Sequence, residues 1–244
     1  MAERLRFQFT PNWRVIALGV LLTPVLVSLG FWQLHRADEK RQLLAAFQQK
    51  RERGPVPIEQ LDPGGNLYYQ PVRLRGEYLR GKNLLLDNRI RRGRFGYEVV
   101  TPFLLADSSR IVLVNRGWVP GDSSRRTLPA IDQSAGRVEL TGDIYVPQGK
   151  PVTLAEERAS GWPRVVQNVD IEGLRKAFRR PLFPYTVRLN GDAPGAYQPN
   201  WTIVNLTPAR HTAYAVQWFA MSAALVLAVV FANSNLWALI KRGK

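Results

Sequence analysis

The chain has 244 residues, a formal net charge of +15, no cysteine, two methionines and two histidines. The lack of cysteine excludes disulfides, thiol redox chemistry, haem attached covalently through C-x-x-C-H and thiolate copper sites, and two methionines exclude a methionine-based copper carrier. Because imidazole is the commonest side-chain ligand of metals and of haem iron, His35 and His211 are the candidate ligands.

Two apolar runs predict two transmembrane helices. Val15–Leu34 has 20 residues without a charge, which at about 1.5 Å per residue spans roughly 30 Å, the thickness of a hydrocarbon core. Thr212–Ile240 is an uncharged run of 29 residues, so we expect spans over 15–34 and 211–240. A cleaved signal peptide is the alternative for the first run, but residues 34–38 offer no small-residue cleavage site and the run is too long.

Basic residues flank both spans. The tails at residues 1–14 and 241–244 carry Arg4, Arg6, Arg14, Lys241, Arg242 and Lys244. By the positive-inside rule both termini are cytoplasmic, and the central domain lies in the periplasm outside an inner (plasma) membrane. Its positive charge favours membrane lipids with anionic headgroups or an acidic partner surface, and no nucleic acid is expected there.

Residues 35–53 predict a helical extension of the first span. They contain no glycine or proline and are rich in helix formers, and Leu43, Leu44 and Phe47 form a thin apolar stripe. Gly54 and Pro55 end the pattern.

Residues 54–210 predict a β-rich domain, because short β-like runs are separated by Gly, Pro, Asn and Asp. The expected strands are residues 72–78, 84–86, 97–105, 111–119, 138–146, 165–169, 185–189 and 203–206, with one helix at 171–178. We expect a membrane α+β protein in which two transmembrane helices flank a mainly antiparallel β domain, barrel-like or sandwich-like.

Little in the external domain indicates catalysis. It has no histidine, cysteine or G-x-S-x-G motif, so the usual base, thiol nucleophile and serine elbow are missing. The chain is therefore not expected to be an enzyme. Paired carboxylates, for example among Asp87, Glu98 and Asp107, are the route left for a membrane-tethered hydrolase, whereas Glu156-Glu157 beside Arg158 is typical of a solvated loop.

Three blocks are more specific than ordinary strand sequence: Leu-Asp-Asn-Arg at 86–89, Gly-Tyr-Glu-Val-Val-Thr-Pro at 96–102 and Val-Asn-Arg-Gly-Trp-Val-Pro at 114–120. One interpretation is turn chemistry, with Asn and Gly supplying positive φ and Trp118 filling the core. The other makes Arg89 and Arg116 donors to carboxylates of a ligand or partner, which a guanidinium fork fits well.

The entry to the second span places three ring-bearing residues on one helix face. Thr207 is a candidate N-cap before Pro208, and His211, Tyr214 and Trp218 follow at i, i+3 and i+7. An aromatic face headed by an imidazole suits a flat apolar macrocycle such as haem, whose propionates Arg210 can meet. The alternative is an interfacial belt, because His, Tyr and Trp favour this depth without binding anything.

In this order the blocks resemble the surfeit locus protein 1 family, the assembly factors of haem–copper cytochrome c oxidase, and the chain is identified as a bacterial member. The resemblance is carried by residues 30–34 with Arg36 and Lys40, 86–89, 96–102, 114–120, 162–163 with Gln167 and Asp170, 180–182, 204–208 and the His211-x-x-Tyr214-Ala215-x-Gln217-Trp218-Phe219 entry. His35 is outside the family motif, in which Gln33, Arg36 and Lys40 recur.

The resemblance implies a non-enzymatic assembly factor that helps haem a reach subunit I of the oxidase, with transient binding of haem a. It makes His211 the candidate iron ligand. We hypothesise that Tyr214 and Trp218 wall the haem and that Arg210 and Arg116 meet its propionates. The expected partners are subunit I and the haem a synthesis machinery. The alternative is a membrane scaffold that binds oxidase subunits or the haem-synthesis enzyme without touching haem.

Overall fold

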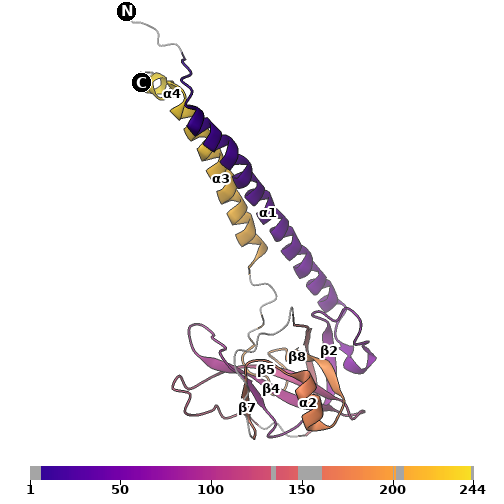
Figure 1. Ribbon diagram of the computed structural model, residues 1–244. Helices are drawn as coiled ribbons and strands as arrows, with labels where there is room; N and C mark the ends of the chain where they lie inside the picture. Colours follow the sequence, from indigo (N-terminus) through magenta and orange to yellow (C-terminus); the bar gives the residue numbers. More distant parts are fainter. Residues whose placement is uncertain (1–6, 133–135, 148–160, 200, 202–205, 243–244) are drawn as a thin grey trace, which may run out of the picture. The chain divides into compact units, whose positions relative to one another are not determined.

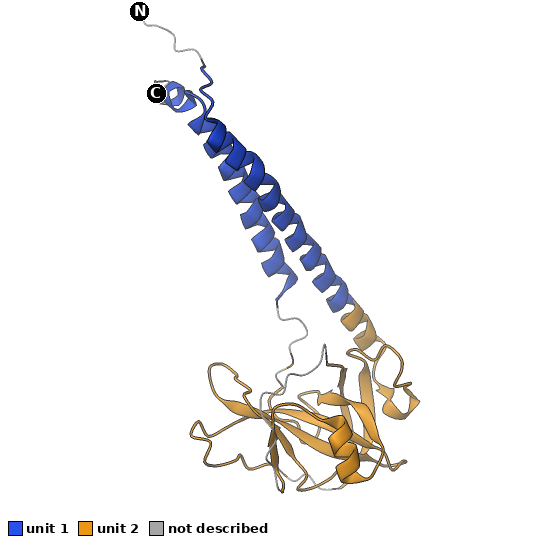
Figure 2. Cartoon of the chain, viewed as in Figure 1, with its two compact units in different colours: residues 1–45, 203–244 blue, residues 46–202 orange. Residues whose placement is uncertain are grey.

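The computed structural model describes residues 7–132, 136–147, 161–199, 201 and 206–242, which belong to two compact units (Figures 1 and 2). Unit 1 consists of residues 1–45 and 203–244, and unit 2 of residues 46–202. The tail residues Arg4, Arg6 and Lys244, the Glu156-Glu157 pair and most of the strand expected at 203–206 lie outside the described residues.

Two helices of unit 1 are long and apolar enough to cross a membrane. Helix α1 extends from Trp13 to Glu52, so the expected span and its helical extension form one uninterrupted helix with Pro24 inside it. Helix α3 extends from Pro208 to Ala232. Many large apolar side chains on both helices are exposed, among them Leu21 and Val216, and such surfaces are stable against lipid rather than water. The fold class expected from the sequence, membrane α+β, is confirmed.

The second apolar run is divided, where a single helix over 211–240 was expected. Helix α3 ends at Ala232, and a short helix α4 covers Leu236–Arg242. The side chains at the break satisfy the last carbonyls of α3, because Asn233 Nδ2 donates to Val229 O and Ser234 Oγ to Val230 O, each at 2.7 Å. The 25 residues of α3 still span about 37 Å, enough to cross a bilayer.

Small residues allow α1 and α3 to pack closely. The buried residues are Gly19, Gly30 and Ala37 on α1 and His211, Ala215 and Ser222 on α3. A Cβ placed on Gly30 would lie 2.5 Å from the ring of Phe219, and one on Gly19 would lie 2.7 Å from Val229 Cγ2. The two helices therefore pack side chain against backbone, as is usual where no hydrophobic effect drives association.

Unit 2 is a single sheet with one short α-helix packed on it. Its elements are β1 Val56–Pro57, the 3-10 helix η1 Ile58–Gln60, β2 Pro71–Tyr78, β3 Leu84–Leu86, β4 Gly96–Leu105, β5 Ile111–Pro120, β6 Val138–Tyr145, β7 Arg164–Val166, α2 Ile171–Phe178 and β8 Leu182–Leu189. Five of the eight strand pairs found in the described residues are antiparallel, in agreement with the expectation.

The sheet closes into a barrel of five strands in the order β2, β6, β8, β5 and β4, because β4 also pairs with β2. Closure occurs at Gly76, which pairs with Leu105 of β4 and with Val138 of β6. A Cβ on Gly76 would lie 2.0 Å from Leu104 O, so only glycine allows β2 to change partners at this corner. Strands β3 and β7 extend the sheet beyond β4.

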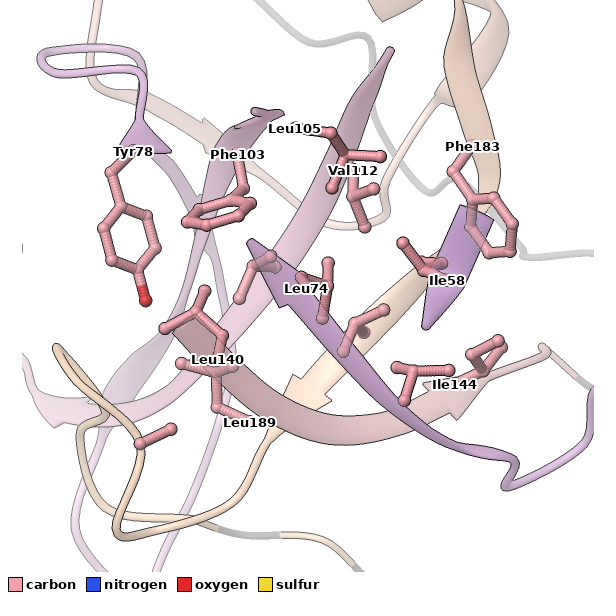
Figure 3. Close-up of a cluster of buried hydrophobic side chains, with 14 of the residues drawn as sticks. Ile58, Leu74, Tyr78, Phe103, Leu105, Val112, Leu140, Ile144, Phe183 and Leu189 are labelled. Atoms are coloured by element: carbon pink, nitrogen blue, oxygen red, sulfur yellow. The ribbon is translucent and has the colours of Figure 1, made fainter. Parts of the chain in front are cut away.

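The barrel interior holds the main apolar core (Figure 3). Side chains such as Leu74, Phe103 and Leu140 come from different strands and are fully buried. A second cluster lies between the sheet and α2, around Leu174 and Leu182. Because β4 and β5 are covered on both sides, nearly all of their residues are buried. This fits their mainly apolar sequences, although Glu98, Asn115 and Arg116 are buried with them.

Two strand boundaries differ from the expectation by three residues. Strand β7 ends at Val166, not at residue 169, because the following residues lead into α2, whose first turn is capped by Asp170: its Oδ1 accepts from Gly173 N at 3.0 Å. Strand β8 begins at Leu182, earlier than the expected residue 185, because it pairs in parallel with β5 from Leu182 opposite Ile111.

The helix pairing of unit 1 is testable with an introduced disulfide. A Cβ on Gly19 lies 3.6 Å from Val229 Cβ, within the range of about 3.5–4.5 Å found in disulfides. We expect G19C/V229C to cross-link almost completely under mild oxidation, which mass spectrometry of the non-reduced protein measures; no native cysteine interferes. The control pair L21C/V229C uses an exposed position on α1, and equal cross-linking of both pairs would contradict this packing.

Candidate functional site

His211 lies in the contact between α1 and α3, where it is 7% exposed. Its Nδ1 is 2.7 Å from Gln33 Oε1. With the amide oxygen as acceptor, Nδ1 carries the proton and Nε2 keeps its lone pair, the form in which imidazole binds a metal. Gln33 therefore selects the tautomer and fixes the ring orientation, as partners of metal-binding histidines do.

The residues expected beside His211 are on the more open side of α3. Tyr214 is 44% exposed, Trp218 is half-buried and Arg210 is exposed. Their side chains are accessible for a flat ligand at the surface of the helix, whereas the imidazole points into the helix contact. The face expected from the sequence thus consists of a buried His211 beside the more accessible rings of Tyr214 and Trp218 and the cation of Arg210.

His35 has a different environment from His211. Its side chain is 75% exposed, and its Nε2 lies 3.3 Å from Glu39 Oε1 on the next turn, which also binds Arg36. A surface position of this kind does not pair with His211 in the helix contact. Among the described residues, no three His, Cys, Asp or Glu side chains gather into a metal site.

Arg116 does not lie where a ligand can reach it, contrary to the expectation that it meets propionates. It is 2% exposed, its Nε donates to Gly195 O at 2.7 Å and its Nη1 to Asp132 O at 3.0 Å. The guanidinium lies between the rings of Tyr78 and Tyr197, with its Cζ 4.9 and 4.7 Å from their centroids. Arg116 is therefore part of the interior of unit 2.

Burial raises the pKa of Tyr78 to about 12, although the positive charge of Arg116 acts in the opposite direction. The phenol is thus neutral at any physiological pH, and its hydroxyl donates to Pro194 O at 2.9 Å. A neutral ring on the guanidinium face is the arrangement that cation–π attraction requires.

Strand β5 contains a β-bulge at Arg116, next to Asn115. In the β4–β5 ladder Val99 lies opposite Gly117 and Val100 opposite Asn115, so Arg116 is the extra residue. Gly117 adopts φ +115°, and a Cβ there would lie 2.8 Å from Gln198 O, so this position requires glycine. Asn115 and Arg116 point to opposite faces, as in a regular strand, so Asn115 donates to Glu98 while Arg116 enters the interior. The bulge shifts the register of the residues that follow, and Trp118 lies opposite Glu98.

The three sequence blocks meet at a cavity of about 280 Å³ in unit 2. The block at 86–89 contributes Leu86 and Arg89, the block at 96–102 contributes Glu98 and Val100, and the block at 114–120 contributes Asn115. Trp118 of the third block also holds the first in place, since its Nε1 donates to Arg89 O at 2.7 Å. These blocks therefore supply turns and also line a cavity.

Polar groups converge on this cavity. Residue Glu98 is 7% exposed, and its Oε2 accepts a hydrogen bond from Asn115 Nδ2 at 2.8 Å. Its Oε1 lies 3.9 Å from Arg89 Nε, an ion pair too long for a hydrogen bond. Strands β6 and β8 add Tyr145 and Arg188. The sequence analysis named Arg89 but missed Arg188. Arg188 is the one arginine in the short, mainly apolar run of β8, and the sequence of that run does not indicate which neighbouring strand the side chain faces.

The chain matches the model of the SURF1 family over residues 20–223. It is 31% identical to human Surfeit locus protein 1, with 84% of this chain and 73% of that protein aligned. It is 26% identical to a SURF1-like protein of Rickettsia felis, over 89% and 96% of the two chains. It is also 32% identical to the yeast protein called Cytochrome oxidase assembly protein SHY1, over 43% of this chain and 28% of that one.

The interior role of Arg116 predicts a large loss of stability when its charge and donors are removed. Arg116→Met leaves two carbonyls without donors and two tyrosine rings without their cation, so the free energy of unfolding should fall by about 3 kcal/mol. Denaturant unfolding followed by tryptophan fluorescence measures this. The exposed Arg137 provides the control, for which Arg137→Met should change the free energy by no more than about 0.5 kcal/mol. Equal effects of the two substitutions would refute the assignment.

Proposed function

This chain belongs to the SURF1 family, and on that basis we propose that it assists the assembly of haem–copper cytochrome c oxidase. The support is the similarity to the yeast protein whose name states that role. Its partners in this proposal are subunit I of the oxidase, which receives haem a, and the haem a synthesis machinery, which supplies it. The two apolar helices anchor the chain in the membrane where such a subunit lies.

We place the chain in the inner membrane with both termini cytoplasmic and the β domain periplasmic. The two ends of unit 1 support a shared side, because Gln8 N donates to Asn235 Oδ1 at 2.8 Å and Thr10 N to Asn233 O at 2.9 Å. Arg14 follows the first of these segments and Lys241 the second, so the basic residues gather on the side that the positive-inside rule assigns to the cytoplasm.

The haem part of the proposal assigns the cargo iron to His211 Nε2. The observation that carries it is the hydrogen bond between His211 Nδ1 and Gln33 Oε1, because it leaves Nε2 as the nitrogen with a free lone pair. Tyr214 and Trp218 provide ring surfaces beside it, and Arg210 is the cation for the propionates. Arg116 has no part in this site because its guanidinium is buried within unit 2.

The burial of His211 sets a condition on binding. At 7% exposure the imidazole reaches iron only when its side chain rotates out of the helix contact or α1 and α3 separate locally. Local separation can keep the hydrogen bond between His211 and Gln33 and gives up helix packing, so this is the movement that the proposal requires, and part of the binding free energy is lost. Modest affinity is what a carrier that must release haem requires.

The haem assignment predicts a spectroscopic difference between the two histidines. Full-length protein purified from cells that make haem a should show a Soret band. His211→Ala should abolish it, and Gln33→Leu should weaken haem affinity about tenfold because the tautomer is no longer held. His35→Ala should retain the band, since His35 is on the exposed surface. Full haem occupancy in the His211→Ala protein, or its loss in His35→Ala, would refute the ligand assignment.

A scaffold without haem is the second candidate, and the same burial favours it. Holding α1 against α3 is a sufficient role for a polar pair across an apolar helix contact. On this view the protein binds oxidase subunits or the haem-synthesis enzyme, and His211 matters through its hydrogen bond to Gln33 alone.

His211→Gln separates the two candidates. A glutamine can hydrogen-bond Gln33 across the helix contact but does not ligate haem iron. In a strain lacking the native protein, the haem role predicts that oxidase activity with His211→Gln falls as far as with His211→Ala. The scaffold role predicts that glutamine restores activity and co-purification of subunit I. The measurement is oxidase turnover in membranes, normalised to the amount of each variant.

A further inference from the structure

The cavity of unit 2 holds charged groups that the proposed function does not use. All of its lining residues belong to unit 2, among them Arg89, Glu98, Asn115, Tyr145 and Arg188. Its volume of about 280 Å³ is close to the lower end of small-molecule sites, roughly 300 Å³. Polar side chains mixed with apolar ones such as Val100 and Ile171 are typical of such sites.

Two arginines of this cavity have donors without acceptors. Four buried side-chain atoms in the described part of the chain lack a hydrogen-bond partner, and all four are arginine nitrogens. Two of them, Arg89 Nε and Arg188 Nε, belong to residues that line the cavity. An unsatisfied buried donor costs free energy that an acceptor in the cavity would recover, so the arrangement favours a ligand with an anionic oxygen.

Aromatic stacking holds Arg188 in an orientation that leaves its edge available. Its Cζ lies 3.6 Å from the centroid of the Tyr145 ring and 5.1 Å from that of Trp201. Stacking uses the faces of a guanidinium, whereas hydrogen bonds use the N–H groups in its plane. The rings therefore preorganise Arg188 for an oxyanion without competing for its donors.

The charges of the cavity define the ligand further. Arg89 and Arg188 contribute two positive charges and Glu98 one negative charge, so the lining is balanced by a monoanion. A dianionic phosphate would leave an excess negative charge beside a carboxylate that is 7% exposed, which is costly in such surroundings. The apolar lining provides contact for a hydrocarbon or aromatic body.

We propose that this cavity binds a small monocarboxylate, whose carboxylate lies between Arg89 and Arg188 and whose apolar body packs against Val100 and Ile171. Asn115 holds Glu98 through its hydrogen bond, and the Glu98 carboxylate offsets one of the two positive charges of the site. Asn115 lies on the same face of the sheet as Glu98 because it pairs with Val100, two residues further along β4. This site is independent of His211 and of haem.

Saturation-transfer difference NMR on the full-length chain in detergent tests the proposal with defined probes. Benzoate is the carboxylate probe, benzyl alcohol its neutral counterpart and benzylamine the cationic one. We expect saturable binding of benzoate and at least tenfold weaker binding of benzyl alcohol and benzylamine, because a charged hydrogen bond contributes about this factor.

Variants locate the binding. Arg89→Gln and Arg188→Gln should each weaken benzoate binding about tenfold. Arg164→Gln is the matched control, because Arg164 also has an unpartnered buried Nε and stacks on an indole, 4.6 Å from Trp162, but does not line this cavity. Thermal unfolding shows which variants are folded. If Arg188→Gln does not fold, Arg89→Gln decides, since the Arg89 side chain is 37% exposed.

Glu98→Gln gives a second test with the opposite sign. It keeps an oxygen that accepts from Asn115 Nδ2 but removes a negative charge from the cavity, so benzoate affinity should rise several-fold. The proposal is overturned if wild-type protein shows no saturable benzoate binding, if Arg89→Gln binds as tightly as Arg164→Gln, or if Glu98→Gln weakens binding. Equal binding of benzyl alcohol, or preference for benzylamine, would also overturn it.

Discussion

The alternation of side chains along β5 determines the chemistry of unit 2. In a regular strand Asn115 and Arg116 point to opposite faces and the next residue continues the alternation. That alternation separates Asn115 from Arg116, and the bulge opposite Val99 and Val100, with the positive φ of Gly117, shifts the register only for the residues that follow. Asn115 then supports Glu98 beside the cavity, while Arg116 is enclosed by Tyr78 and Tyr197. Core stability and the polar lining of the cavity therefore depend on the same three residues of β5, Asn115, Arg116 and Gly117.

In unit 1 the corresponding constraint is a polar pair within an apolar contact. Glycines and alanines bring α1 and α3 so close that His211 and Gln33 meet. The pair holds the two helices together and, in the proposed haem role, leaves Nε2 as the ligand atom. These roles oppose each other, because the helix contact that orients the imidazole also covers it. For the proposed haem role, this opposition predicts a weak, releasable interaction.

Much of the secondary structure could be predicted from local sequence. Helix α2 occupies residues 171–178 as expected, because Asp170 caps its start and Pro181 soon follows its end. The long strands β4 and β5 were equally clear, since their apolar runs are bounded by turn residues. The end of α3 was not foreseen: Asn233 and Ser234 are uncharged and do not interrupt an apolar run, yet their side chains bind the carbonyls of its last turn.

Composition and periodicity along the chain were enough to predict two membrane-spanning segments, a β-rich domain between them, the exclusion of thiol chemistry and His211 as the leading ligand candidate. The folded structure was needed to show that Arg89 borders a cavity and Arg116 does not, that Arg188 lines it from another strand, and that Gln33 contacts His211. Such contacts depend on strand register, bulges and helix packing. Because they join residues far apart in sequence, local sequence patterns do not predict them.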